Sequence, residues 1–167
     1  MAVHRSGARL AGALVAACML MFVPLTGGAF TAAQAQERIS VEFRTALKPH
    51  GRWHSHRRWG DVWTPARIAD DWRPYKLGRW SYTRDWGWYW ASDEDFGWVV
   101  YHYGRWVRDP DLGWVWVPGR EWGPAYVQWR RGGDHVGWAP LPPEEIIVEY
   151  RDEPDVWLFV RSRDILA

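Results

Sequence analysis

Through much of the chain, Trp and other bulky side chains recur at every second position, and this period of two predicts short β-strands. Trp88 and Trp90 fall on one face of such a strand, with Tyr89 on the other. Trp114 and Trp116 again share a face. Runs of residues that favour turns separate the strands at 92–95, 109–111, 118–119 and 130–134. The pattern therefore predicts an all-β fold of short antiparallel strands, including one within 98–107.

The strand pattern repeats along the sequence. The triplet Gly-Arg-Trp begins at Gly51, Gly78 and Gly104, in steps of 27 and 26 residues. A second marker, a Gly followed by a Trp-containing strand, begins at Gly60, Gly87 and Gly113 with the same steps, and the last unit is shorter. Each unit fits two strands and a turn, so the sequence predicts tandem antiparallel hairpin repeats that form a meander sheet. The period fits a rolled, barrel-like sheet, a sandwich and an open stack equally well.

Residues 1–35 have the pattern of a secretory signal peptide. Arg5 and Arg9 give a positive start, residues 10–23 are largely apolar, and Ala33-Gln34-Ala35 matches a small-x-small cleavage site. The apolar run is short for a membrane-spanning helix, which needs about 20 residues. The alternatives to cleavage after Ala35 are an uncleaved anchor and, because Val15-Ala16-Ala17-Cys18 resembles a lipobox, acylation of Cys18. We expect a periplasmic or secreted protein with no membrane span after cleavage.

The rest of the chain divides into three predicted parts. Residues 36–50 form a flexible lead-in with an edge strand at 41–45, and residues 51–143 form a Trp-rich β-repeat domain. Residues 144–167 form a C-terminal hairpin and tail. The strands of that hairpin are expected at 144–150 and 156–161.

Tryptophan is the unusual feature of the composition, with 16 residues in a chain of 167. A buried Trp removes about 150–250 Å² of surface from water, so aromatic packing is expected to stabilise the fold. The net charge of +1 argues against a nucleic-acid partner, because such proteins carry a broad positive surface. Cleavage after Ala35 removes the single Cys, which leaves neither a disulfide nor a thiol nucleophile. Motifs for phosphate-binding loops and zinc peptidases are absent from the sequence, and we expect no cofactor.

Several strings of the sequence resemble a known bacterial family. They are FGWVVYHYGRW at residues 96–106, GWVWVPG at 113–119, and WRRGG at 129–133 leading to VGWAPLPP at 136–143. These strings are similar to the Trp-rich repeat domain of unknown function found in exported proteins, mostly of Gram-negative bacteria. The resemblance covers roughly residues 51–161; it implies export and a repeat architecture, and it assigns no catalytic residue. The first unit departs from the pattern, because Asp61 stands where later units have Trp and residues 54–58 replace the usual turn.

The repeated Trp and Arg residues are the main binding candidates. In a strand, the Arg of each Gly-Arg-Trp points away from the Trp and can lie across an aromatic ring of a neighbouring strand. The same residues fit a structural ladder that covers the sheet, or an exposed row of rings that stacks on sugars. The candidate set is Trp53, Trp80, Trp88, Trp90, Trp106, Trp114, Trp116, Arg79 and Arg105.

A metal site is the weaker interpretation of two further patterns. His50, His54 and His56 lie within seven residues, but zinc requires three or four ligands, and a solvated basic loop explains the cluster as well. The acidic residues of 93–95 and 109–111 offer oxygens to calcium, but they match ordinary turns and lack the spacing of a calcium loop. We therefore expect no metal.

Three functions remain in order of preference. The first is a non-catalytic structural or interaction module of the cell envelope, with an envelope polysaccharide or another envelope protein as partner. The second is a glycan-binding module that uses exposed Trp rings. The third is a glycoside hydrolase with acids among Glu121, Glu144 and Glu145, which no flanking motif supports. Unpaired strand edges also favour self-association.

Overall fold

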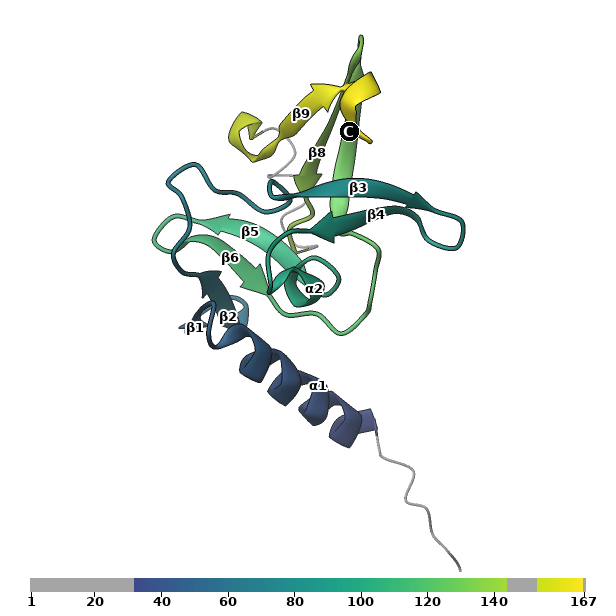
Figure 1. Cartoon of the computed structure of the whole chain (residues 1–167). Coiled ribbons are helices and arrows are strands. Elements are labelled where there is room, and N and C mark those ends of the chain that lie inside the picture. Colours follow the sequence, from purple (N-terminus) through teal and green to yellow (C-terminus); the bar gives the residue numbers. More distant parts are fainter. Residues whose placement is uncertain (1–31, 144–152, 167) are drawn as a thin grey trace, which may run out of the picture.

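Each repeat unit of the sequence forms one β-hairpin in the computed structural model, which describes residues 32–143 and 153–166, with side chains from residue 40 onward. Figure 1 shows the hairpins in chain order. They are β1 (Gly51–His56) with β2 (Gly60–Pro65), β3 (Gly78–Thr83) with β4 (Gly87–Ser92), β5 (Arg105–Asp109) with β6 (Gly113–Val117), and β7 (Val127–Gly132) with β8 (His135–Pro140).

The hairpins assemble into three antiparallel sheets. Strands β1-β2-β6-β5 form one sheet, β3-β4 stand as a pair, and β7-β8 continue into β9 (Leu158–Arg161). The first sheet joins two hairpins through the pairing of Trp63 in β2 with Trp116 in β6. The prediction of an all-β fold built from antiparallel hairpins is confirmed, and the described strands form no closed barrel.

A cross-strand pair of tryptophans recurs in every hairpin. The Trp of each Gly-Arg-Trp lies opposite the last Trp of the second marker, and the fourth hairpin has an equivalent pair. The pairs are Trp53–Trp63, Trp80–Trp90, Trp106–Trp116 and Trp129–Trp138. Directly opposed side chains are the closest neighbours across an antiparallel ladder, so the repeat places two indoles in contact range in each unit.

The first Gly of each repeat makes room for the second indole of the pair. A Cβ atom on Gly51, Gly78 or Gly104 would lie 2.1–2.4 Å from the carbonyl oxygen of a residue on the opposite strand, and within 2.9 Å of the paired Trp. Only a residue without a Cβ permits this approach. The spacing of twelve residues between this Gly and the paired Trp is the same in all three units, and it is a packing requirement of the hairpin.

Most of the tryptophan surface enters a single aromatic core. Eight Trp side chains are buried: Trp63, Trp72, Trp80, Trp90, Trp106, Trp116, Trp138 and Trp157. All but Trp157 lie in the main cluster, with Tyr75, Tyr101 and Phe96 among their neighbours. On the β1-β2-β6-β5 sheet, Val62, Val107 and Val115 face the other way and pack with Trp157 in a smaller cluster. Both faces of this sheet are thus covered by apolar side chains.

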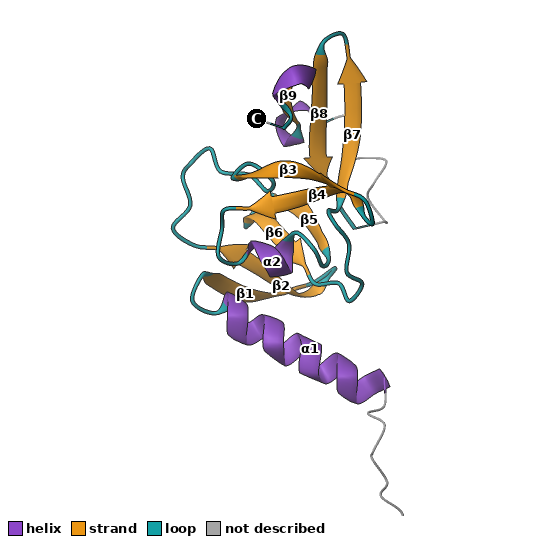
Figure 2. Cartoon of the chain, turned by 45° about the vertical axis from the view of Figure 1, so that its right-hand side comes forward, coloured by secondary structure: helices purple, strands orange, loops and turns teal. Residues whose placement is uncertain are grey.

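Two predicted strand regions are helical instead. Residues 36–50 are not a flexible lead-in with an edge strand: α1 (Ala32–Leu47) runs through them, and its Phe43 and Leu47 enter the core. The helix extends away from the β-structure toward its N-terminal end (Figure 2). Residues 98–107 begin with the short helix α2 (Gly97–Val100), and β5 starts only at Arg105. In both places apolar residues at helical spacing reach the core, which overrides β-propensity.

The C-terminal part contains β9 between two short 3₁₀ helices, η2 (Pro154–Val156) and η3 (Ser162–Asp164). Its predicted partner strand at 144–150, the connecting residues 151–152, and residues 1–31 of the predicted signal peptide lie outside the described residues. Within the described part of the chain, β9 pairs with β8. The first unit, despite its unusual turn, pairs regularly from Gly51–Pro65 to His56–Gly60.

Candidate functional site

The predicted binding tryptophans are mainly core residues. Trp80, Trp90, Trp106 and Trp116 are buried, whereas Trp53, Trp88 and Trp114 are half-buried. The exposed tryptophans occupy other positions of the repeat: Trp86, Trp98, Trp122 and Trp129. Most marker residues therefore build the fold, and contact with a ligand falls mainly to rings that the sequence analysis did not select.

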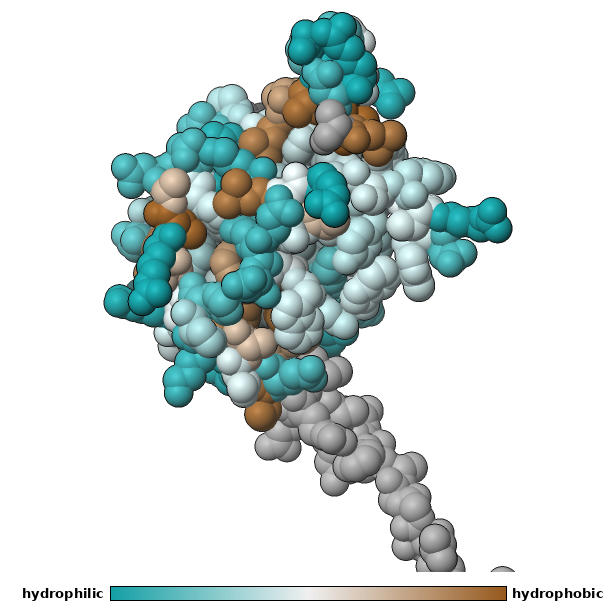
Figure 3. All heavy atoms as spheres, viewed as in Figure 1, coloured by the Kyte–Doolittle hydropathy of each residue, from teal (hydrophilic) through white to brown (hydrophobic). Residues whose placement is uncertain are grey.

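One face of the β3-β4 hairpin carries an aromatic surface. Tyr82 and Trp88 are cross-strand partners, with ring centroids 5.5 Å apart, and Tyr82 is 68% exposed. Trp129 of β7 lies 6.2 Å from Trp88 and is itself exposed. The buried Trp80 contacts both Trp88 and Trp129, so these two rings pack against the aromatic core. In Figure 3 the surface over the β3-β4 hairpin, at the right of the view, is mostly pale, the colour of residues of intermediate hydropathy.

A groove of about 360 Å³ adjoins these rings. Its lining includes Trp88, Trp129, Arg130 and Arg131, together with Ser162 of η3 and Ile165. The guanidinium of Arg130 lies 4.1 Å from the ring centre of Trp157, which does not line the groove, so Arg131 is the arginine that faces a ligand there. Such a volume is in the range of small-molecule and oligomer subsites. The groove combines flat apolar walls with cationic hydrogen-bond donors.

The opposite face of the same hairpin carries a second group of rings. Tyr89 stacks on His102, with 4.7 Å between ring centres and 15° between planes, and His102 stacks on Trp122 at 5.9 Å and 19°. Trp86, in the turn before β4, meets Trp122 edge-on at 4.6 Å and is 60% exposed. We call the exposed and half-buried rings of both faces, Tyr82, Trp86, Trp88, Trp122 and Trp129, the hairpin patch.

His102 holds the second group of rings in place as a neutral imidazole. It is only 4% exposed, and its Nδ1 donates to the carbonyl oxygen of Gly123, 2.9 Å away. The backbone N–H of Gly123 donates in return to the His102 carbonyl. Burial lowers the pKa of His102, although the backbone hydrogen bonds at Gly123 and Pro124 oppose this effect.

This burial predicts a loss of stability in mild acid. The unfolded chain binds a proton at His102 below its ordinary pKa of 6.5, whereas the folded protein resists protonation, so the free energy of unfolding falls as the pH drops from 6.5. The slope contributed by one such group is at most about 1.4 kcal/mol per pH unit. In urea titrations between about pH 7 and 5, His102→Asn should be less stable than wild type at pH 7 and should show a flatter dependence. Equal slopes for the two proteins would contradict a neutral buried imidazole.

The candidate arginines act in different ways. The Arg105 guanidinium lies 3.9 Å from the ring centre of Tyr126, which precedes β7, so this contact is not part of a ladder between strands. Arg79 instead forms an exposed ion pair with Asp93 at 3.7 Å. A continuous Arg–Trp ladder along the sheet is therefore not formed. Exposed pairs of this kind contribute little to stability.

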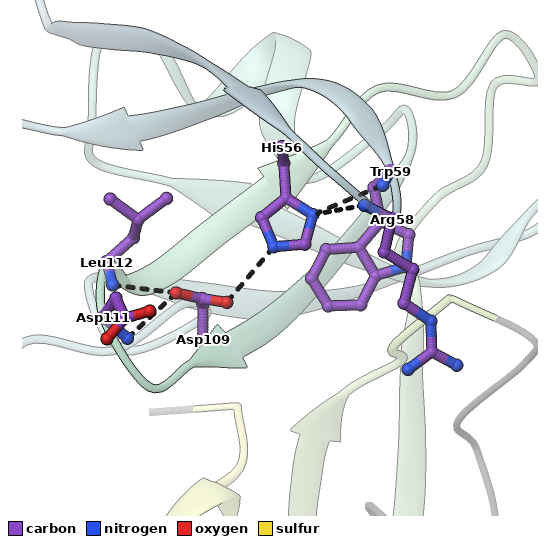
Figure 4. Close-up of polar contacts among 6 residues, drawn as sticks. All are labelled: His56, Arg58, Trp59, Asp109, Asp111 and Leu112. Carbon is purple, nitrogen blue, oxygen red and sulfur yellow. Dashed lines mark hydrogen bonds and ion pairs between the residues drawn. The ribbon is translucent and has the colours of Figure 1, made fainter.

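The three histidines have separate partners. His50 packs against Phe96, His54 hydrogen-bonds the Thr64 hydroxyl at 2.9 Å, and His56 approaches Asp109 at 3.3 Å. Figure 4 shows that the His56 Nδ1 also accepts from the backbone N–H groups of Arg58 and Trp59. Across the described part of the chain, no group of three or more His, Cys, Asp or Glu residues is placed to hold a metal ion.

The acidic candidates serve the local structure. Asp109 accepts from the backbone N–H groups of Asp111 and Leu112, and these bonds, with His56, lower its pKa against the raising effect of burial. Glu94 accepts from the Trp72 indole at 2.7 Å and from the Tyr101 hydroxyl, and burial raises its pKa. Glu121 is exposed, and its carbonyl oxygen accepts from the Tyr126 hydroxyl at 2.8 Å. Glu144 and Glu145 lie outside the described residues.

Of the hairpin patch, the sequence analysis selected Trp88 and missed Tyr82, Trp86, Trp122 and Trp129, which stand outside the two repeat markers. Trp86 and Trp122 each precede a Gly, and Trp129 lies within β7, in a unit that is shorter than the others. For Trp86 and Trp122 a signal was available, since a Trp outside the strands is not required by the hairpin ladder. Only tertiary structure shows that these positions converge on β3-β4.

Comparisons with known proteins assign no function to this surface. No helix in the described part of the chain combines the length and apolar character required to cross a membrane. Comparison with curated proteins and with solved structures gave no match. A model of a family of unknown function, DUF6600, matches residues 44–145, and the chain belongs to this family.

Proposed function

We propose that this protein is a non-catalytic interaction module of the cell envelope that binds polysaccharide through the hairpin patch. The observation that carries the proposal is the group of Tyr82, Trp88 and Trp129 on one face of the β3-β4 hairpin, beside a groove that Arg131 lines. Isolated exposed aromatics are common on protein surfaces, but a contiguous group of this kind marks an interaction site. The predicted signal peptide supports an envelope or extracellular location for this activity.

Sugar rings suit the chemistry of the patch. Their C–H faces pack on flat indole surfaces, and their hydroxyl and carboxylate groups accept hydrogen bonds from arginine. Trp88 and Trp129 supply the flat surfaces, and Arg131 lies on the wall of the groove between them. Trp80 and Trp138 contact Trp129 from below, so the site is held in shape before binding, which reduces the entropic cost of association.

Removing one ring of the patch is the test. Intrinsic fluorescence of wild type is expected to change on titration with at least one member of a panel of envelope polysaccharides and peptidoglycan. Trp129→Ala is expected to weaken that binding roughly tenfold, equivalent to about 1.4 kcal/mol. Tyr82→Ala, on the same face as Trp88 and 68% exposed, is a second variant that leaves the core contacts of Trp129 intact and should also weaken binding.

Trp98→Ala is the matched control, because Trp98 is also exposed, at 47%, but lies near Phe43 of α1 and outside the patch. It should bind as wild type does. A flat response of the wild-type protein across the whole panel would reject the proposal, and so would equal losses in Trp98→Ala and Trp129→Ala.

A further inference from the structure

The two ring groups of the hairpin patch lie on opposite faces of one β-hairpin. Among the described strands, β3 and β4 pair only with each other. Neighbouring residues of a strand point to opposite sides, so Trp88 lies on one face with Tyr82, and Tyr89 lies on the other face with His102. In Figure 1 the turn of this hairpin projects at the right of the view, away from the other labelled elements. Both faces can therefore be approached from solvent near the turn.

The second group of rings brings together two copies of one short string. Arg84-Asp85-Trp86-Gly87 forms the turn of the hairpin and the first residue of β4, and Arg120-Glu121-Trp122-Gly123 lies between β6 and β7. The two indoles meet edge-on, with 4.6 Å between ring centres, and they are 60% and 39% exposed. Neither Trp lies in a strand, so neither is required by a hairpin ladder. A contiguous exposed pair of this kind is typical of an interaction site.

The rings of the second group are held in place by the fold. Trp122 stacks on the buried His102, which is itself fixed by hydrogen bonds to the backbone. The backbone N–H of Trp86 donates to the Thr83 hydroxyl at 3.1 Å, and this hydroxyl donates to the Gly87 carbonyl oxygen at 3.1 Å. The two indoles are thus arranged before a ligand arrives, which lowers the entropic cost of binding.

The two faces differ in the charges around their rings. The groove beside the first group is lined by Arg130 and Arg131 and by no acidic residue of the described chain. At the second group each Trp follows one basic and one acidic residue, and all four of these residues are exposed. Sugar hydroxyl groups donate to carboxylates and accept from guanidinium groups. The balanced charges of the second group therefore fit an uncharged sugar unit, whereas the first group adds a positive charge.

We infer that the hairpin binds two polysaccharide chains, one on each face, and so cross-links them; this inference rests on the proposed function. The strands β3 and β4 lie between the ring groups. A chain that packs on Trp88 and Trp129 must fold back around the hairpin to reach Trp86 and Trp122, and two separate chains avoid this bend. The partner of the second face is thus another polysaccharide chain with uncharged units. Several protein molecules along the same two chains strengthen the link through multivalency.

Light scattering by the mature full-length chain tests the link. The probes are alginate, which is acidic, dextran, which is neutral, and soluble glycan strands released from peptidoglycan. With at least one probe, or one mixture of two, scattering is expected to rise as protein is added. It is expected to fall again at excess protein, because each site on a chain then holds its own protein molecule. Short oligosaccharides of the same probes should bind without scattering, because each offers a single site.

Variants of each face separate linking from binding. Trp122→Ala and Trp86→Ala are expected to abolish the rise in scattering and to keep the Kd of the first face within about twofold of wild type. Trp86 lies in an exposed turn, so its variant tests the second face without disturbing the contact of Trp122 with His102. Trp129→Ala should abolish scattering through the first face. Trp98→Ala, exposed outside both groups, is the control and should link chains as wild type does.

The inference is overturned if wild type binds a probe but scatters at no ratio, or if Trp122→Ala and Trp86→Ala both scatter as wild type does. A dimer that bound through the first face of each copy would give the latter result, so self-association does not imitate the expected one. Equal loss of scattering in Trp98→Ala would also overturn it. Absence of binding to every probe in the fluorescence titration rejects the proposed function itself.

Discussion

Trp116→Ala is expected to lower the free energy of unfolding by about 3–5 kcal/mol, the range for deletion of a buried aromatic side chain. Trp116 is fully buried, pairs with Trp106 across its own hairpin, and pairs with Trp63 across the junction with the first hairpin. Its indole also donates to the Tyr103 carbonyl oxygen at 2.7 Å. Because domains of this size are stable by only about 5–15 kcal/mol, the variant should be close to unfolding at 37 °C.

The measurement is urea unfolding followed by far-UV circular dichroism, with Trp98→Ala as the control. Trp98→Ala removes the same side chain from an exposed position, so this variant should lose less than about 1 kcal/mol of the free energy of unfolding. Similar losses at both positions would show that Trp116 does not join the two hairpins. Trp116→Phe should fall between these values, because it keeps a ring but loses the donor to Tyr103.

Gly104→Ala is expected to destabilise the protein far more than Gly113→Ala, although the two glycines have nearly the same φ angle. Their φ angles are +73° and +74°, so both variants incur the left-handed cost of about 1–2 kcal/mol. A Cβ at Gly104 would also lie 2.2 Å from the Val117 carbonyl oxygen, whereas a Cβ at Gly113 meets no atom within 4 Å. The backbone of β5 must shift only in the first variant.

Both variants can be compared in one set of denaturation curves. Gly113→Ala should remain folded with a reduced midpoint, and Gly104→Ala should lose at least about 2 kcal/mol more, in the range of other overpacked sites. Equal destabilisation would mean that the close approach of Trp116 and Val117 to Gly104 is relaxed in solution. Comparing the two variants thus separates the cost of the positive φ angle from the cost of steric overlap with the opposite strand.

The hairpins were predictable because their signals are local. Period-two alternation, turn residues and the regular spacing of Gly51, Gly78 and Gly104 all lie within one unit and specify strands and turns. The pairing of β2 with β6, by contrast, joins residues more than fifty positions apart, and no local pattern encodes it. The helix α1 was missed because the apolar positions Phe43 and Leu47 are few and fit a short strand as well.

The binding surface was less predictable than the fold. A repeated Trp is required by the ladder of its own hairpin, so repetition indicates structure, and the four ladder pairs take up most of the marker residues. Whether Trp86 or Trp129 is exposed depends on how separate hairpins pack. Burial of an indole is a property of the assembled protein, and composition alone does not give it.

The order of strands limits how this architecture can change in length. In a solenoid each unit touches only its neighbours in sequence, and copies can be added or removed along the axis. Here the first and third hairpins share a sheet and the second stands apart from it. Removing or duplicating one unit would place the wrong hairpin beside β2 and break the shared sheet. Homologues with this arrangement should therefore keep a constant number of units, and gene duplication should yield tandem whole domains.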